Sequence, residues 1–162
     1  MRLDRRASAA LRSALLIACL LAIVVPAGGA RPTGYLRGFT QTRAIIETSG
    51  HVCLVLEIYL ADSPDQHRQG LMFIDQMDEF EGMLFRYERV AMIHMWMKNT
   101  HIPLDMVFIR GDGEISGIAR RTTPMSTKRI SSPEPVPLVL ELNGGMTERW
   151  QIEPGNRLLA IN

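Results

Sequence analysis

The stretch "LDMVFIRGDGEISGIAR", residues 104–120, determines the fold class of this sequence. Two apolar runs rich in β-branched residues flank Asp112-Gly113, a dipeptide typical of the tight turn between antiparallel strands. The stretch therefore predicts a β-hairpin, and the rest of the chain is best interpreted around it.

A second hairpin is predicted upstream, where "RAIIET" (43–48) and "VCLVLEIYL" (52–60) are separated by a short turn. A short helix is predicted over 64–72, since Ser63 can cap it and Pro64 suits its first position. One or two helical turns are predicted within 144–152. Further short strands are predicted at 82–85, 90–97 and 136–143, and after Pro154-Gly155.

This succession of short strands with one or two short helices is typical of a mainly β fold. We expect a compact antiparallel β-sandwich or barrel, formed by one domain over residues 43–162. Alternating strand and helix units are absent from the pattern, which argues against a Rossmann-type nucleotide-binding fold.

The N-terminus has the pattern of an export signal. Four arginines precede the apolar run "LLIACLLAIVV" (15–25), and the small residues Gly28 and Ala30 follow it. We expect a signal peptide over residues 1–30, cleaved after about Ala30, and a flexible leader over 31–42. The run is too short to span a bilayer, so a periplasmic or secreted protein without a stable membrane span is predicted.

Processing would change the cysteine content and the charge. "LIAC" ends at Cys19 like a lipoprotein box, but the apolar run continues to Val25, so a lipid anchor at Cys19 is not expected. The processed chain would keep Cys53 alone and form no internal disulfide. It would carry 14 basic and 16 acidic residues, a net charge of −2 that gives no reason to expect nucleic acid as a partner.

The most unusual residues lie in "VAMIHMWMKNTHIPLDMVFI", residues 90–109. In a strand over 90–97 the odd-numbered residues form an apolar face that should be core, and Val90, Met92, His94 and Trp96 share the other. Trp96, Lys98, Asn99 and Asp105 then surround one hairpin mouth, where an aromatic plane, a cation, an amide and a carboxylate could bind a small polar molecule or a partner chain. A purely structural alternative has Lys98 and Asp105 as an ordinary ion pair and Asn99 in a left-handed turn position.

Two further functions are open. "His94-Met95-Trp96-Met97" resembles a fragment of periplasmic Cu(I)- and Ag(I)-binding proteins, although strand alternation leaves only Met92 on the side of His94. No resident cofactor is otherwise expected, with Cu(I) as the alternative. An envelope enzyme using Asp105 with Lys98 or His94 is the third hypothesis, but the sequence has no Gly-x-Ser-x-Gly, His-Glu-x-x-His or Cys-x-x-Cys motif. We therefore expect a binding domain rather than an enzyme.

Several of these segments together resemble a known family. "RQGLMF" (68–73), "GMLF" (82–85), "WMKNTHIPLDMVFI" (96–109), "VLELNGG" (139–145) and the Pro154-Gly155 turn resemble, in that order, the landmarks of domain-of-unknown-function family 192. The resemblance covers about residues 43–162. It implies a compact, mainly β fold that is often exported, and no established activity.

The resemblance also implies a set of hallmark residues. Its polar members, which a β core does not need, are Arg68, Lys98, Asn99, Asp105 and Glu141, and we expect some of them to meet at one ligand pocket with Trp96 as its floor. Two positions depart from the family: Met95 replaces a usual phenylalanine, a tolerable change in a core face, and Asn156 replaces a usual aspartate. The other hallmark residues are Gly70, Leu71, Met72, Gly82, Met83, Met97, Thr100, Pro103, Leu104 and Gly145.

Overall fold

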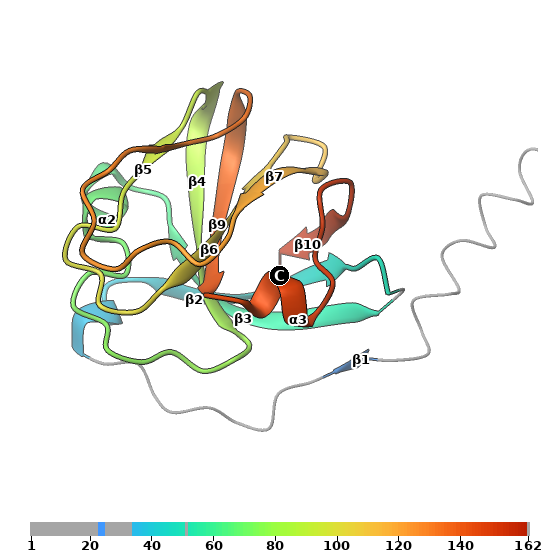
Figure 1. Cartoon of the computed structure of the whole chain (residues 1–162), viewed down its shortest axis with the longest axis horizontal. Helices are drawn as coiled ribbons and strands as arrows, with labels where there is room; N and C mark the ends of the chain where they lie inside the picture. Colours follow the sequence, from blue (N-terminus) through green and yellow to red (C-terminus); the bar gives the residue numbers. More distant parts are fainter. Residues whose placement is uncertain (1–22, 25–33, 51, 162) are drawn as a thin grey trace, which may run out of the picture.

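The computed structural model describes residues 23–24, 34–50 and 52–161. It confirms a mainly β fold with short helices (Figure 1). The elements are β1 (Ile23–Val24), the 3-10 turn η2 (Gly34–Leu36), β2 (Thr40–Glu47), β3 (Cys53–Ala61), α2 (Pro64–Gln69), β4 (Glu81–Ala91), β5 (His94–Met95), β6 (Leu104–Ile109), β7 (Ile115–Ala119), β8 (Ile130–Ser131), β9 (Val136–Asn143), α3 (Met146–Arg149) and β10 (Arg157–Ile161).

One curled sheet holds most of the strands, in the order β10-β2-β3-β4-β9-β6-β7. Along this path every pair is antiparallel except β3 with β4, which run parallel because the chain crosses over through α2 between them. The two ends of the sheet meet at the isolated bridge between Glu114 and Arg157. The Leu158 amide donates to the Gly113 carbonyl over 2.8 Å, so the sheet closes on itself like a barrel.

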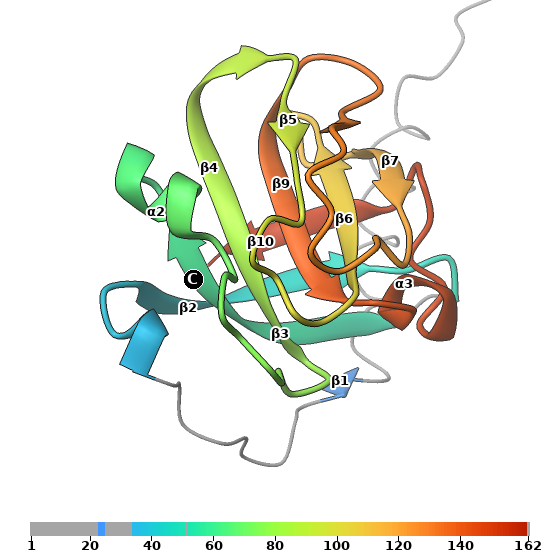
Figure 2. The ribbon, with the colours of Figure 1, turned by 60° about the vertical axis from the view of Figure 1, so that its left-hand side comes forward.

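Each face of the sheet carries its own apolar cluster. Alternation along β9 places Leu140 and Leu142 in the cluster that also contains Leu54 and Val107. Val139 belongs to the opposite cluster, which α2 and the segment around β5 cover. Figure 2 shows this β5 segment crossing in front of the sheet. The functional question concerns this second, covered face.

Both predicted hairpins are present. β2 and β3 pair antiparallel, as do β6 and β7, and Gly113 in the turn of the second hairpin has a φ of 88°. The helix predicted over 64–72 ends earlier, at Gln69, since Gly70 adopts φ 49° and reverses the chain. Ser63 and Gln66 form the capping box that starts it.

The strands predicted at 82–85 and 90–97 differ from the structure. β4 is one long strand over residues 81–91, which includes the whole of the first predicted strand and the start of the second. The segment after it contributes only the two-residue β5, which pairs with β8. The predicted alternation nevertheless holds from residue 93 to 97: Ile93, Met95 and Met97 are buried, and His94 and Trp96 are exposed.

Most of the N-terminal predictions lie outside the described residues, including nearly all of the expected signal peptide and Cys19. Within them, Ile23 of β1 pairs with Cys53, a buried residue that is disulfide-bonded in this chain of 162 residues. The partner cysteine lies outside the described residues. The expectation of no internal disulfide applies to the processed chain, which lacks residues 1–30, and so it stays a prediction.

The segment expected to be a flexible leader, 31–42, differs from that expectation where it is described. η2 and the start of β2 lie within it, and Leu36 and Phe39 are buried in the core because both are large and apolar. Among the described residues, no helix has the length and apolar character needed to cross a membrane.

Candidate functional site

A pocket of about 230 Å³ lies on the covered face of the sheet, between α2, β4, β9 and the β5 segment. It collects residues far apart in the sequence, and four of the six predicted ligand-binding residues line it. The lining comprises His67, Arg68, Gln69, Gly70, Leu71, Met72, Phe85, Tyr87, His94, Met95, Trp96, Lys98, Thr100 and Glu141.

Glu141 is the least exposed polar residue of this lining. It sits in the middle of β9, between Met83 of β4 and Met106 of β6, and all three side chains are at most 3% exposed. Its carboxyl group makes no hydrogen bond or ion pair with the described residues. Burial raises the pKa of Glu141 to about 8, because removing a carboxylate from water disfavours its charged form. At neutral pH Glu141 is therefore an uncharged acid that can donate a proton toward the pocket.

Close contact between β4 and β9 fixes the position of Glu141. Gly82 lies opposite Leu142, and a Cβ there would stand 2.6 Å from the carbonyl oxygen of Glu141. Only glycine permits this approach, which gives one of the family's hallmark positions a physical reason.

Tyr87 forms the wall beside Glu141 and was missed in the sequence. Burial, and secondarily the nearby Glu141, raise the pKa of Tyr87 to about 12. Its hydroxyl donates to Met95 Sδ over 3.5 Å, and its ring centroid lies 4.5 Å from that of His67. In one continuous strand over 81–91, alternation places Tyr87 on the same face as Met83 and Phe85. The two shorter strands predicted from the sequence do not include Tyr87, so they do not reveal this relationship.

α2 supplies the basic residues on one side of the pocket. His67 Nε2 lies 3.0 Å from the Ala61 carbonyl oxygen and must carry the proton, since a carbonyl can only accept. Arg68 pairs with Asp65 one turn earlier in the helix, but its side chain stays 69% exposed at the pocket.

Trp96 and Lys98 form the opposite side of the mouth. The buried Met97 between them anchors the segment, and its amide donates to the Ser126 carbonyl over 2.9 Å. Trp96 is 52% exposed, so it is a wall at the mouth rather than the floor we expected. The Lys98 side chain makes no hydrogen bond or ion pair with any part of the chain that the structure describes.

The remaining two predicted residues do not line the pocket. Asn99 takes the left-handed conformation at φ 55°, and its carbonyl accepts the Phe73 amide over 2.8 Å, as the turn alternative anticipated. Asp105 lies on the other face of the sheet. Residues directly opposite each other share a face, and Asp105 lies opposite Leu142 of β9, whereas Met106 lies opposite Glu141. No ion pair joins Asp105 to Lys98, so that part of the structural alternative is wrong.

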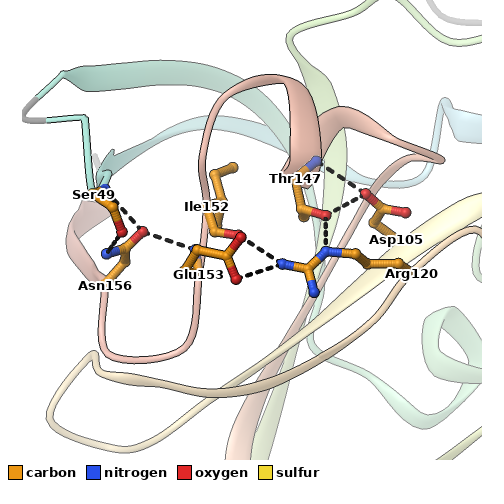
Figure 3. Close-up of polar contacts among 7 residues, drawn as sticks. All are labelled: Ser49, Asp105, Arg120, Thr147, Ile152, Glu153 and Asn156. Carbon is orange, nitrogen blue, oxygen red and sulfur yellow. Dashed lines mark hydrogen bonds and ion pairs between the residues drawn. The ribbon is translucent and has the colours of Figure 1, made fainter.

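Asp105 instead belongs to a buried polar network, and Figure 3 shows its contacts with Thr147. One carboxylate oxygen accepts the amides of Arg121 and Gly145 at 2.7 and 3.0 Å. The other accepts the amide and hydroxyl of Thr147 at 2.9 and 2.6 Å. With four donors on a residue that is 0% exposed, Asp105 is fully satisfied and holds the start of α3 on the sheet.

The network extends to the last turn of the chain. Arg120 bridges the Thr147 hydroxyl and the Glu153 carboxylate, at 3.2 and 2.7 Å (Figure 3). Asn156 then accepts the Glu153 amide over 2.8 Å and donates to Ser49 Oγ over 3.0 Å. The residue that departs from the family pattern, Asn156, thus uses both its amide oxygen and its amide nitrogen in this turn.

The residues of the soft-metal hypothesis are separated by burial. Met92 and His94 are exposed, and His94 Nδ1 lies 3.0 Å from Ser131 Oγ. The Met95 and Met97 sulfurs are buried and accept hydrogen bonds from Tyr87 and Thr122. The described residues contain no group of three or more His, Cys, Asp or Glu arranged to hold a metal. A Cu(I) site at Met92 and His94 stays a prediction.

The family model DUF192, described as "Uncharacterized ACR", matches residues 44–160. The chain belongs to this family. No curated protein matches this chain. A DUF192 relationship therefore confirms the resemblance seen in the sequence and brings no activity with it.

Solved structures similar to this DUF192 chain agree with the fold. A protein of Sinorhizobium meliloti 1021, described as a candidate transcription regulator, is 42% identical with a TM-score of 0.73, over 75% of this chain and 94% of its own. A protein of unknown function from Novosphingobium aromaticivorans DSM 12444 is 29% identical with a TM-score of 0.75, over 84% of this chain and 94% of its own.

Proposed function

We propose that this DUF192 protein is an exported binding domain that takes a small organic ligand in the pocket beside Glu141. The observation that carries the proposal is the state of Glu141, which is 3% exposed, lines the pocket and has no partner among the described residues. Placing a carboxyl group in so apolar a site is unfavourable unless a partner satisfies it. A methionine or leucine would serve the sheet better at this position, so a ligand that satisfies the carboxyl explains why a glutamate stands there.

The form of the pocket supports a small ligand. Its volume of about 230 Å³ is below the usual range for drug-sized molecules, which is roughly 300–1,000 Å³. Apolar side chains from α2, β4 and β5 surround a few polar groups, the usual composition of a small-molecule site.

Export is the other part of the proposal and rests on the signal pattern of residues 1–30. Expression of the full chain in a bacterium with an outer membrane, followed by mass measurement of the periplasmic product, tests it. A product that begins near Arg31 supports export, and an uncleaved cytoplasmic product contradicts it. The role ascribed to the S. meliloti relative is not carried over, because a processed net charge of −2 gives no electrostatic basis for binding DNA.

Binding is tested by the fluorescence of Trp96, which lines the pocket mouth. Trp150→Phe removes the other tryptophan, so the emission of that variant reports the pocket alone. The protein recovered from full-chain expression is screened against small aromatic and aliphatic compounds, each supplied as an acid, an amide and an amine. Saturable emission changes that disappear in Glu141→Leu support the proposal.

A matched control exchanges the two tryptophans. In Trp96→Phe the remaining Trp150, which donates to Glu79 and packs on Phe80, lies outside the pocket lining and should not respond. No response by any compound in Trp150→Phe, or responses that Glu141→Leu leaves unchanged, would refute the pocket as the binding site.

A further inference from the structure

We propose that the pocket selects a small organic carboxylate with an apolar body, held between the Glu141 carboxyl group and the cationic side chains of Arg68 and Lys98. This inference rests on the proposed function and names the chemical class of its ligand. It follows from the charges, donors and apolar surfaces that line the pocket.

The charges of the lining are unbalanced. Arg68 and Lys98 are cationic, and Glu141 is the only carboxyl group among the lining residues. Burial keeps Glu141 uncharged at neutral pH, and Asp65, outside the lining, pairs with Arg68, so Lys98 is the lining cation whose charge no described residue compensates. Positive charge at the mouth of an otherwise apolar pocket attracts an anionic occupant.

Both cations have donors to spare for a ligand. The Lys98 side chain makes no ion pair or hydrogen bond with the described residues. Arg68 pairs with Asp65 through one nitrogen, and the guanidinium group has further N–H donors. The fork of an arginine and the point charge of a lysine are both suited to a carboxylate.

Glu141 can also bind a carboxylate. As an uncharged acid it can donate its O–H to a carboxylate oxygen, a charge-assisted hydrogen bond of the strong class. Tyr87 cannot take this role as it stands, because its hydroxyl already donates to Met95 Sδ.

The rest of the lining is suited to an apolar body. Leu71, Phe85 and Met95 are buried within it, and Trp96 offers a half-exposed aromatic surface at the mouth. A ligand ammonium group would meet two like charges here and would require Glu141 to ionise against its burial. A neutral amide could accept a hydrogen bond from Lys98 through its oxygen, but it carries no charge to pair with the ammonium group.

Three probes with one apolar body test the inference: phenylacetate, phenylacetamide and phenethylamine, titrated calorimetrically into the protein recovered from full-chain expression at pH 7. We expect phenylacetate to bind at least about tenfold more tightly than the amide, from a favourable charge interaction of the size expected near a protein surface, and the amine to bind weakest. Lys98→Gln should reduce phenylacetate affinity about five- to tenfold and the amide affinity by a clearly smaller factor, because only the carboxylate loses a charge interaction.

Lys128→Gln is the matched control, since Lys128 is the other lysine of the sequence, is exposed and does not line the pocket. Equal or tighter binding of the amide or the amine overturns the carboxylate inference and leaves the pocket intact as a binding site. An equal loss of phenylacetate affinity in both lysine variants overturns it as well, because the attraction would then be a property of the whole surface. Absence of any binding, by these probes and by the wider screen, removes the proposed function itself.

Discussion

Glu141 and Met83 lie directly opposite each other on β9 and β4, so a carboxyl group stands beside a thioether in the middle of the sheet. Met106 flanks Glu141 from β6, and neither methionine has any exposed surface. These soft apolar neighbours offer the carboxyl no charge and no strong donor. The protonation state of Glu141 is therefore set by burial, and this has consequences for stability and for binding.

The first prediction concerns stability against pH. An unfolded glutamate ionises with a pKa near 4.5 and the folded Glu141 near 8, so between these values the native state binds one proton that the unfolded state has lost. Stability must then fall as pH rises, by about 1.4 kcal/mol per pH unit. Relative to Glu141→Gln, which cannot titrate, the native protein should lose about 3 kcal/mol between pH 4.5 and 7.

Urea unfolding at a series of pH values measures this difference. Glu88→Gln provides the control, because Glu88 is exposed on the same strand that flanks Glu141, and its profile should run parallel to that of the native protein. If the Glu141→Gln profile also runs parallel to the native one, Glu141 is not buried as an uncharged acid.

The second prediction separates Asp105 from the pocket. Asp105→Ala removes an acceptor from four buried donors, which should lower the free energy of unfolding by about 3–5 kcal/mol. The surviving folded fraction should bind phenylacetate as the native protein does, because Asp105 lies on the other face of the sheet. Denaturation midpoints and calorimetric titrations measure the two effects.

Asp75→Ala is the comparison for Asp105, since the Asp75 side chain is 82% exposed and pairs with His101 at the surface. It should change stability by less than about 1 kcal/mol. A small stability loss in Asp105→Ala together with loss of phenylacetate binding would contradict this prediction and show that Asp105 belongs to the ligand site.

The contrast between Asp105 and Glu141 shows what the sequence could and could not predict. Strand alternation correctly grouped Asp105 with Val107 and Ile109, and the two hairpins, the helix cap and the core face of Met95 and Met97 followed from local pattern. Which face of the sheet carries a pocket depends on the register between β6 and β9, where Met106 rather than Asp105 meets Glu141. That register joins residues about 35 apart in the sequence and leaves no local signal.

Tyr87 and Trp96 illustrate a second reason. The sequence between 86 and 90 is polar, so the pattern predicts two short strands where the structure has the single strand β4. The prediction therefore does not place Tyr87 on the same face as Phe85. The exposure of Trp96 depends on how the 122–135 connection holds the β5 segment, through the Met97 amide on Ser126 and the Ile93 amide on Ser132. Such long-range contacts set the depth of a side chain, which alternation alone cannot give.

The third prediction addresses the soft-metal hypothesis. Met92 and His94 are exposed, whereas the Met95 and Met97 sulfurs are buried and accept hydroxyl hydrogen bonds, so two donors at most can reach an ion. We expect only weak binding of Ag(I) or Cu(I), without saturable quenching of Trp96 at stoichiometric metal in Trp150→Phe under reducing conditions. Stoichiometric quenching that is lost in His94→Ala, but kept in the control His101→Ala, would establish the metal site instead.

The last prediction follows from the titration of Glu141 in the pocket. Above pH 8 the acid ionises, loses the proton it donates and repels a ligand carboxylate, so the affinity for phenylacetate should fall about tenfold per pH unit between pH 8.5 and 10. The ligand itself, an acid of ordinary pKa near 4, stays ionised throughout.

Burial, and then Glu141, keep the pKa of Tyr87 at about 12, so its phenol stays neutral in this range. The other titratable or charged groups that face the pocket are His67 and Arg68 from α2, His94 from β5, and Lys98. Titrations of Glu141→Gln at each pH cancel their contributions, since that variant keeps all of them and still presents an N–H donor. A fall of equal size in Glu141→Gln, or a flat profile in the native protein, would show that Glu141 does not hold the ligand as an uncharged acid.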